Sequence, residues 1–146
     1  MSEVPGHHAV LRLPRPPPDF APAYYRPTAR DVRPSDGDKH DAKERGVPVR
    51  VSVWDEERTS ARQAADFRSV RPLLVLRALG SEVASVGETI RIVYDPLGGA
   101  DASRPGAEGH AGIEGLDRPD GHPRAAWNKF LDDVAGAFEL VEVIED

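Results

Sequence analysis

Histidine and carboxylate side chains gather in residues 110–122, and their types are those of a metal site. Among them are two imidazoles and two carboxylates whose types suit a metal, those of His110, Glu114, Asp117 and His122. Two imidazoles and one carboxylate can hold a divalent metal and leave coordination positions open for a substrate. We therefore take these four residues as candidate metal ligands and expect no organic cofactor. The alternative interpretation is a set of solvent-exposed loop residues.

Acid–base chemistry without a metal is a second interpretation of the same region. Asp95 follows an apolar run that predicts a strand, and a carboxylate at the end of a strand can work with an imidazole such as His110 as general base. Asp95-Pro96 is also an ordinary strand-ending turn. No serine stands in a G-x-S-x-G motif, so the sequence indicates no serine nucleophile.

A strand and a helix are expected to hold the two ends of this region. Residues 89–94 alternate in the manner of a strand, and apolar residues recur at helical spacing from Trp127 to Phe138, after Pro123. Residues 95–122 between them are rich in glycine and proline, which predicts a long Gly-rich loop. A loop of that length in a compact domain is either functional or poorly ordered.

The rest of the chain supplies further strands and helices. Strands are expected at 9–13, 47–53, 73–79 and 140–144, and helices at 35–46 and 59–68. The run at 73–79 is continuously apolar, which is typical of a strand covered on both faces. These elements predict an α/β or α+β fold with a mixed sheet of four or five strands and about three helices.

Proline separates the beginning of the chain from the remainder. Eight of the 14 prolines fall in residues 1–34. Proline lacks the amide donor that helices and paired strands require, so this segment is expected to be an extended arm with at most a short strand. Tyr24 and Tyr25 are its candidate partner-binding residues. Residues 35–146 are expected to form a single compact α/β domain.

Acidic residues outnumber basic ones and concentrate at the end of the sequence. The chain has 25 Asp and Glu against 19 Lys and Arg, a net charge of −6, and residues 132–146 hold six acidic residues with no basic one. An acidic surface disfavours nucleic acid and favours a basic protein partner. Glu139, Glu142 and Glu145 are therefore candidate contacts for such a partner.

Cysteine is absent, which excludes disulfides, cysteine-ligated metal centres and thiol nucleophiles. No apolar run approaches the roughly 20 residues that cross a bilayer, and no secretory signal pattern is visible. The expected location is the cytoplasm, away from any membrane.

Three function classes remain. The leading hypothesis is a non-enzymatic protein-binding or regulatory accessory module, because the segment 1–34 and the acidic C-terminal segment both suit a protein partner. The first alternative is a small metal-dependent or acid–base hydrolase that uses residues 95–122. The second is a nucleic-acid or nucleotide binder that uses the arginines of residues 1–34.

Overall fold

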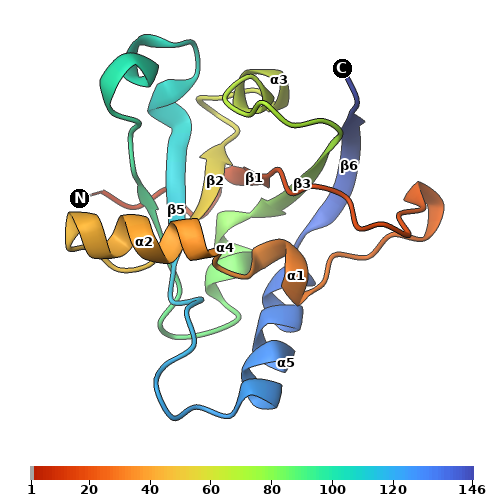
Figure 1. Cartoon of the computed structure of the whole chain (residues 1–146), viewed down its shortest axis with the longest axis vertical. Helices are drawn as coiled ribbons and strands as arrows, with labels where there is room; N and C mark the ends of the chain where they lie inside the picture. Colours follow the sequence, from red (N-terminus) through yellow and green to blue (C-terminus); the bar gives the residue numbers. More distant parts are fainter. Residues whose placement is uncertain (1) are drawn as a thin grey trace.

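Six antiparallel strands form one sheet in the order β4-β5-β2-β1-β3-β6 in the computed structural model, which describes residues 2–146 (Figure 1). Met1, the first residue of the expected arm, lies outside the described residues. The strands are β1 Ala9–Arg12, β2 Val51–Asp55, β3 Leu73–Leu79, β4 Arg91–Tyr94, β5 His110–Glu114 and β6 Glu139–Ile144. The fold is α+β, as predicted, although each strand pairing is antiparallel where the sequence predicted a mixed sheet.

Five α-helices accompany the sheet: α1 Ala29–Val32, α2 Asp36–Arg45, α3 Ala61–Ala65, α4 Gly80–Ala84 and α5 Arg124–Ala135. Local chemistry explains the ends of α2. The Ser35 hydroxyl accepts a hydrogen bond from the Asp38 amide at 3.0 Å, and Gly46 ends the helix in the left-handed conformation. Short 3₁₀ turns occur at Pro22–Tyr24, Gly99–Ser103 and Ala107–Gly109.

Within residues 2–146, none of the helices has the length and apolar content needed to span a bilayer.

The sheet buries both of its faces, and β3 shows this directly. Leu74 and Leu76 pack in one apolar cluster, while Leu73 and Val75 pack in a second. Side chains alternate along a strand, so the two clusters lie on opposite faces. The expectation that residues 73–79 are covered on both faces is confirmed.

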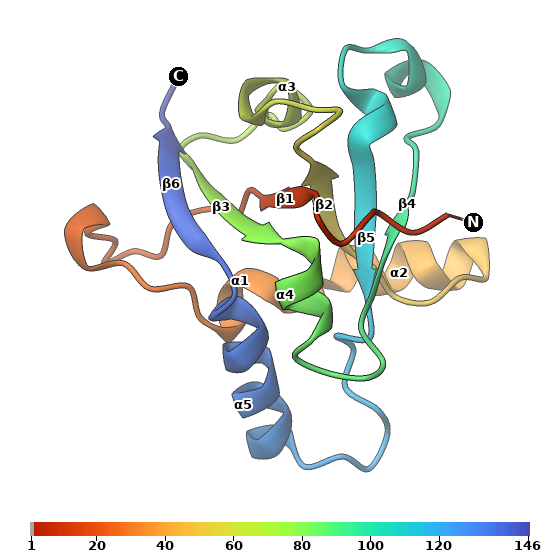
Figure 2. The same ribbon diagram turned by 180° about the vertical axis from the view of Figure 1, so that it is seen from behind.

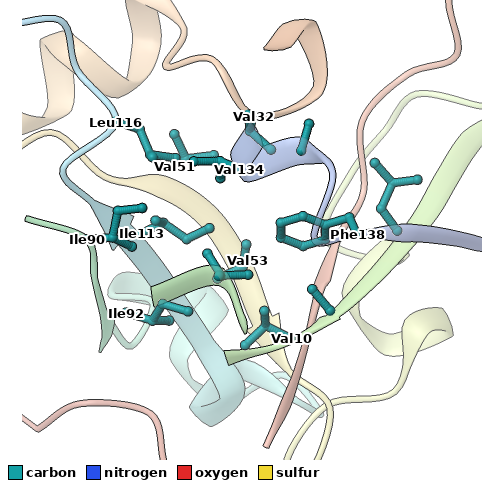
Figure 3. Packing of buried hydrophobic residues seen from close by; sticks show 14 of the residues in the cluster. Val10, Val32, Val51, Val53, Ile90, Ile92, Ile113, Leu116, Val134 and Phe138 are labelled. Atoms are coloured by element: carbon teal, nitrogen blue, oxygen red, sulfur yellow. The ribbon is translucent and has the colours of Figure 1, made fainter. Parts of the chain in front are cut away.

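Helices α1, α4 and α5 supply the first cluster, in which Val32, Val134 and Phe138 pack against strand residues such as Val10 and Val53 (Figures 2 and 3). Phe138 lies three residues beyond the end of α5 and is still buried. On the other face α3 contributes Ala64 and Ala65. There Trp54 stacks on Phe67 with ring centroids 4.9 Å apart.

Strand β1 lies in the middle of the sheet, between β2 and β3. Four of its residues pair with β3, and Val10 is fully buried. The expected arm therefore contributes a central strand, and the boundary expected at residue 35 does not separate it from the domain. Only the residues between β1 and α1, which carry six of the 14 prolines, lead away from the sheet (Figure 1).

Strand β5 occupies part of the region expected to be a loop. It pairs with β2 on one side and with β4 on the other. Gly112 stands opposite Ser52, and a Cβ atom added to it would lie 2.6 Å from the Cβ of Arg50. The glycine that suggested a loop is thus required by the close approach of a neighbouring strand.

Candidate functional site

A polar patch covers the β2–β5 part of the second sheet face, beside the cluster under α3. Arg50, just before β2, and Ser52 of β2 alternate with the buried Val51 and Val53, and the polar residues of β5 alternate with Ala111 and Ile113 in the same way. The strand register sets Ser52 opposite Gly112. Since Gly112 has no side chain, a neighbouring side chain of β5 can reach across to Ser52.

His110 is that side chain, and it is held at both ring nitrogens. Its Nε2 lies 2.7 Å from the Ser52 hydroxyl oxygen, and its Nδ1 lies 2.6 Å from the Asp95 carbonyl oxygen. A carbonyl only accepts, so the proton of the neutral ring belongs on Nδ1, and Nε2 accepts from the Ser52 hydroxyl. Burial lowers the pKa of His110, which favours this neutral form.

The Asp95 carboxylate points to arginine and not to His110. Arg45 donates to it through both terminal nitrogens, at 2.7 and 3.1 Å, and Arg50 Nη1 lies 3.6 Å away. Burial alone would raise the pKa of Asp95, but the hydrogen bonds and charge of Arg45 outweigh it and hold the pKa below its usual value. Asp95 thus meets His110, as the sequence suggested, but through its backbone carbonyl.

An open hollow of about 410 Å³ gives access to the His110 ring. It lies between the end of α2 and the segment that follows β4, and its walls include Arg45, Asp95 and Leu97. The Ser52 hydroxyl, the neutral His110 imidazole and the Asp95 carbonyl thus lie in a chain of hydrogen bonds. In this arrangement His110 can take the hydroxyl proton of Ser52.

The four candidate metal ligands do not meet. Glu114 accepts from Arg50 Nε at 3.0 Å, Asp117 lies 3.9 Å from Lys39 Nζ, and the ring of His122 sits edge-on to Trp127. No group of three or more metal-ligating side chains is found in residues 2–146. The reason is geometric: residues four apart in a strand, such as His110 and Glu114, are about 13 Å apart, whereas in a helix they would be neighbours.

The two candidate tyrosines have different environments. The Tyr25 hydroxyl donates to the buried carboxylate of Asp31, and its ring packs edge-on against Phe20 with centroids 5.2 Å apart. Burial, followed by that hydrogen bond, raises the pKa of Tyr25. Tyr24 is 88 % exposed, in the loop that projects on the β6 side of the molecule (Figures 1 and 2). Tyr25 therefore anchors the loop, and Tyr24 is free to touch a partner.

Glu139 and Glu142 lie on β6, and Glu145 directly follows it. All three are exposed, and none forms an ion pair with the described residues 2–146. Val141, at the irregular step where β6 shifts its register against β3, is 47 % exposed. The strand thus presents acidic and apolar side chains together at one end of the sheet.

The arginines of residues 1–34 have separate roles. Arg12 donates from the protein interior to the carbonyl oxygens of Asp31 and Ser52, and Arg30 pairs with Asp31 at 2.9 Å. Arg15, Arg26 and Arg33 are exposed. Arg33 nevertheless donates to the side-chain oxygen of Asn128 at 2.9 Å, so three of the five arginines are engaged with the fold itself.

No protein-family model, curated protein or solved structure matches this chain. Ser52 is the residue that sequence reasoning missed. The alternation of Arg50, Val51, Ser52 and Val53 did indicate that Ser52 lies on a polar face, but the strand that brings His110 to it was not expected.

Proposed function

We propose that the protein is a protein-binding accessory module that adds an extended, basic segment of a partner protein to its sheet along β6. The observation that supports this proposal is the difference between the two sheet edges. Residues 2–4 bridge the outer side of β4, where the Val4 amide donates to Ile92 at 2.9 Å and the Tyr94 amide donates to Ser2 at 3.0 Å. Within residues 2–146, β6 pairs with β3 alone.

A free edge strand offers unpaired backbone groups that an extended peptide can use. The two faces of β6 would then select the side chains of that peptide. Leu140 and Val143 share the face of the first cluster, and Glu139 and Glu142 share the other face. A partner strand that alternates apolar and basic residues matches both.

Charge also selects against a second copy of the chain. Pairing of β6 with another β6 would place the glutamates of two copies close together, and like charges at cross-strand positions destabilise a pair. The acidic side chains that protect the edge from self-association are therefore the same ones that admit a basic strand.

The test is a titration of the full chain, followed by NMR of the backbone amides, with a capped peptide of alternating valine and lysine. We expect saturable shifts confined to β6 and its neighbour β3. A peptide of alternating valine and glutamate is expected to cause none. Absence of β6 shifts at millimolar peptide, or equal binding of both peptides, would overturn the proposal.

A variant with reversed charge on β6 tests whether the glutamates of this strand determine which peptide binds. The double variant Glu139→Lys/Glu142→Lys is expected to lose its binding of the lysine peptide and to gain binding of the glutamate peptide. Glu88→Lys/Glu108→Lys is the matched control, because both residues are exposed and lie outside β6. The control should retain the preference for the lysine peptide. If it changes preference as well, net charge and not β6 controls binding.

The contact between Ser52 and His110 favours a second candidate function, acyl transfer to water. Ser52 Oγ would attack the carbonyl carbon of an activated ester while His110 Nε2 takes the hydroxyl proton. The leaving alcohol takes that proton, and a water molecule then hydrolyses the acyl-serine. The hollow beside His110 would admit a small ester.

p-Nitrophenyl acetate tests this candidate. We expect release of p-nitrophenol and transient acetylation of Ser52, detected by mass spectrometry of the peptide that contains it. Ser52→Ala and His110→Gln should both lose the label, and Ser103→Ala, a change at an exposed residue of the 3₁₀ turn Gly99–Ser103, should retain it. Acetylation at other residues only, or equal turnover by Ser52→Ala, would exclude Ser52 as a nucleophile.

A further inference from the structure

A small pocket beside α5 gathers positive charge in an otherwise acidic protein. Its volume is about 120 Å³, and buried Leu116 and Leu131 line it together with the Trp127 ring. Four cationic side chains surround it: Arg33, Lys39, Arg118 and Arg124. Asp117 is the one carboxylate in its lining, so the local charge is four positive and one negative, or +3, in a chain of net charge −6.

The three arginines at this pocket lack a carboxylate partner. Arg33 donates to the side-chain oxygen of Asn128 at 2.9 Å, and Arg118 donates to the His122 carbonyl at 2.8 Å. Neither acceptor carries a charge. Arg124 forms no side-chain hydrogen bond or ion pair within residues 2–146. Arginines elsewhere, such as Arg45, Arg50 and Arg77, are paired with carboxylates. The charge at this pocket is therefore uncompensated.

We infer that this pocket binds the phosphate group of a small phosphorylated compound. Guanidinium groups match phosphate oxygens with paired hydrogen bonds, and a phosphate dianion balances more of the +3 charge than a carboxylate can. The volume is below the roughly 300 Å³ at which pockets bury a drug-sized ligand. The pocket thus fits one phosphate group, and the half-buried Trp127 in its lining can contact the organic part of a phosphomonoester.

The indole N–H of Trp127 is the reporter for the test, observed by NMR. It donates to the Leu116 carbonyl at 3.0 Å, and both residues line the pocket. Trp54, the other tryptophan, is buried in the cluster under α3 and serves as an internal control. At constant ionic strength, inorganic phosphate and phenyl phosphate should each shift the Trp127 indole signal to saturation, while the Trp54 signal stays in place.

The two compounds distinguish the source of the phosphate group. Tighter binding of phenyl phosphate assigns the pocket to a phosphomonoester, and equal binding assigns it to inorganic phosphate. Sodium chloride should give no saturable shift. If neither phosphate compound shifts the Trp127 signal, or if chloride shifts it equally, the inference fails.

Three variants test which residues bind the phosphate, and they are chosen so that a folding defect cannot explain all of the results. Arg124→Ala, which removes no side-chain hydrogen bond or ion pair within residues 2–146, should raise the Kd at least about tenfold. Arg26→Ala removes the same charge from an exposed site outside the pocket and should leave the Kd unchanged. Asp117→Asn should lower the Kd, because the carboxylate repels phosphate, and a folding defect cannot produce that gain. Equal effects of Arg124→Ala and Arg26→Ala, or weaker binding by Asp117→Asn, would overturn the assignment.

Discussion

Ser52 and His110 meet across two antiparallel strands, with the serine hydroxyl oxygen 2.7 Å from the imidazole Nε2. Gly112, which pairs with Ser52 in the register, has no side chain to obstruct the contact, and the Asp95 carbonyl fixes the ring from behind at 2.6 Å. Ser52 donates to Nε2 only while the imidazole is uncharged, because the one proton of the neutral ring is committed to the carbonyl, and burial favours that uncharged form. The protonation of His110 is therefore linked to the stability of the fold.

The first prediction concerns that linkage. Burial lowers the pKa of His110 in the folded protein below its value of about 6.5 in the unfolded chain. The unfolded chain binds the proton more readily, so the free energy of unfolding should fall as pH drops from about 7 through the lowered pKa. His110→Gln should weaken this dependence, measured by urea unfolding at a series of pH values.

His122→Gln is the control, because His122 lies outside the sheet and its removal should leave the slope unchanged. If His110→Gln retains the full loss of stability between pH 7 and 5, another group is responsible. In that case the neutral imidazole assigned to His110 is wrong.

The second prediction concerns Asp55, a fully buried carboxylate at the end of β2. It accepts from the Tyr94 hydroxyl at 2.5 Å, from His8 Nδ1 at 3.0 Å and from the Glu57 amide at 3.0 Å. Asp55→Ala leaves these donors without their acceptor and should lower the free energy of unfolding by about 3 kcal/mol or more. Tyr94→Phe, which removes one donor, should cost about 1 kcal/mol.

Acid should weaken the same network. Burial alone would raise the pKa of Asp55, but the bonds from Tyr94, His8 and the Glu57 amide together lower it. A lowered carboxyl pKa stabilises the fold above the unfolded value of about 3.9, and this contribution is lost as pH falls through the folded value. Asp55→Asn should therefore unfold less steeply with acid between pH 5 and 2. An unchanged slope would contradict the assignment.

The third prediction concerns Gly115, which follows β5 with φ of +92°. A Cβ atom there would lie 2.4 Å from the Thr89 carbonyl oxygen. The left-handed conformation costs a residue with a side chain about 1–2 kcal/mol, and the clash adds a similar amount. Gly115→Ala should thus destabilise the protein by about 3 kcal/mol in urea unfolding. Gly98→Ala, with open space around it, should change the free energy of unfolding little. If Gly98→Ala destabilises the protein as much as Gly115→Ala, the backbone conformation and the clash at Gly115 do not explain its cost.

Local chemistry made parts of the fold predictable. Ser35 and Gly46 bound a helix of almost wholly polar residues, and the apolar run from Leu73 to Leu79 identified a strand covered on both faces. The capping of a helix and the burial of a strand depend on the residues within the segment itself. Such elements can therefore be predicted from a single sequence.

The strand order could not be predicted in that way, because it depends on residues far apart in the chain. The run from Ala9 to Arg12 reads as a minor strand beside many prolines, yet β3 and β2 flank it on both sides. Gly112 favours a loop locally, but its lack of a side chain is what allows β5 to approach β2. The same long-range pairing brings Ser52 to His110, so this contact was missed while His110 itself was identified.

The last prediction concerns Arg12, where β1 and β2 separate. The two strands pair only at Val10 and Leu11. Beyond that point the Arg12 guanidinium spans the gap, donating to the Ser52 carbonyl at 3.0 Å and to the carbonyl of Asp31 in α1 at 2.9 Å. Burial lowers the pKa of Arg12, and Asp38 and Asp31 partly offset this effect. A lysine cannot reproduce the forked pair of bonds.

Arg12→Lys should therefore lower the free energy of unfolding by about 2 kcal/mol, and Arg12→Ala by about 3 kcal/mol, because two carbonyl groups lose a charged donor. Arg15→Ala removes the same charge from an exposed neighbour and should stay within about 0.5 kcal/mol of the parent protein. Equal stability of Arg12→Lys and the parent would mean that positive charge alone suffices at this position. The fork that joins β2 to α1 through β1 would then have no energetic role.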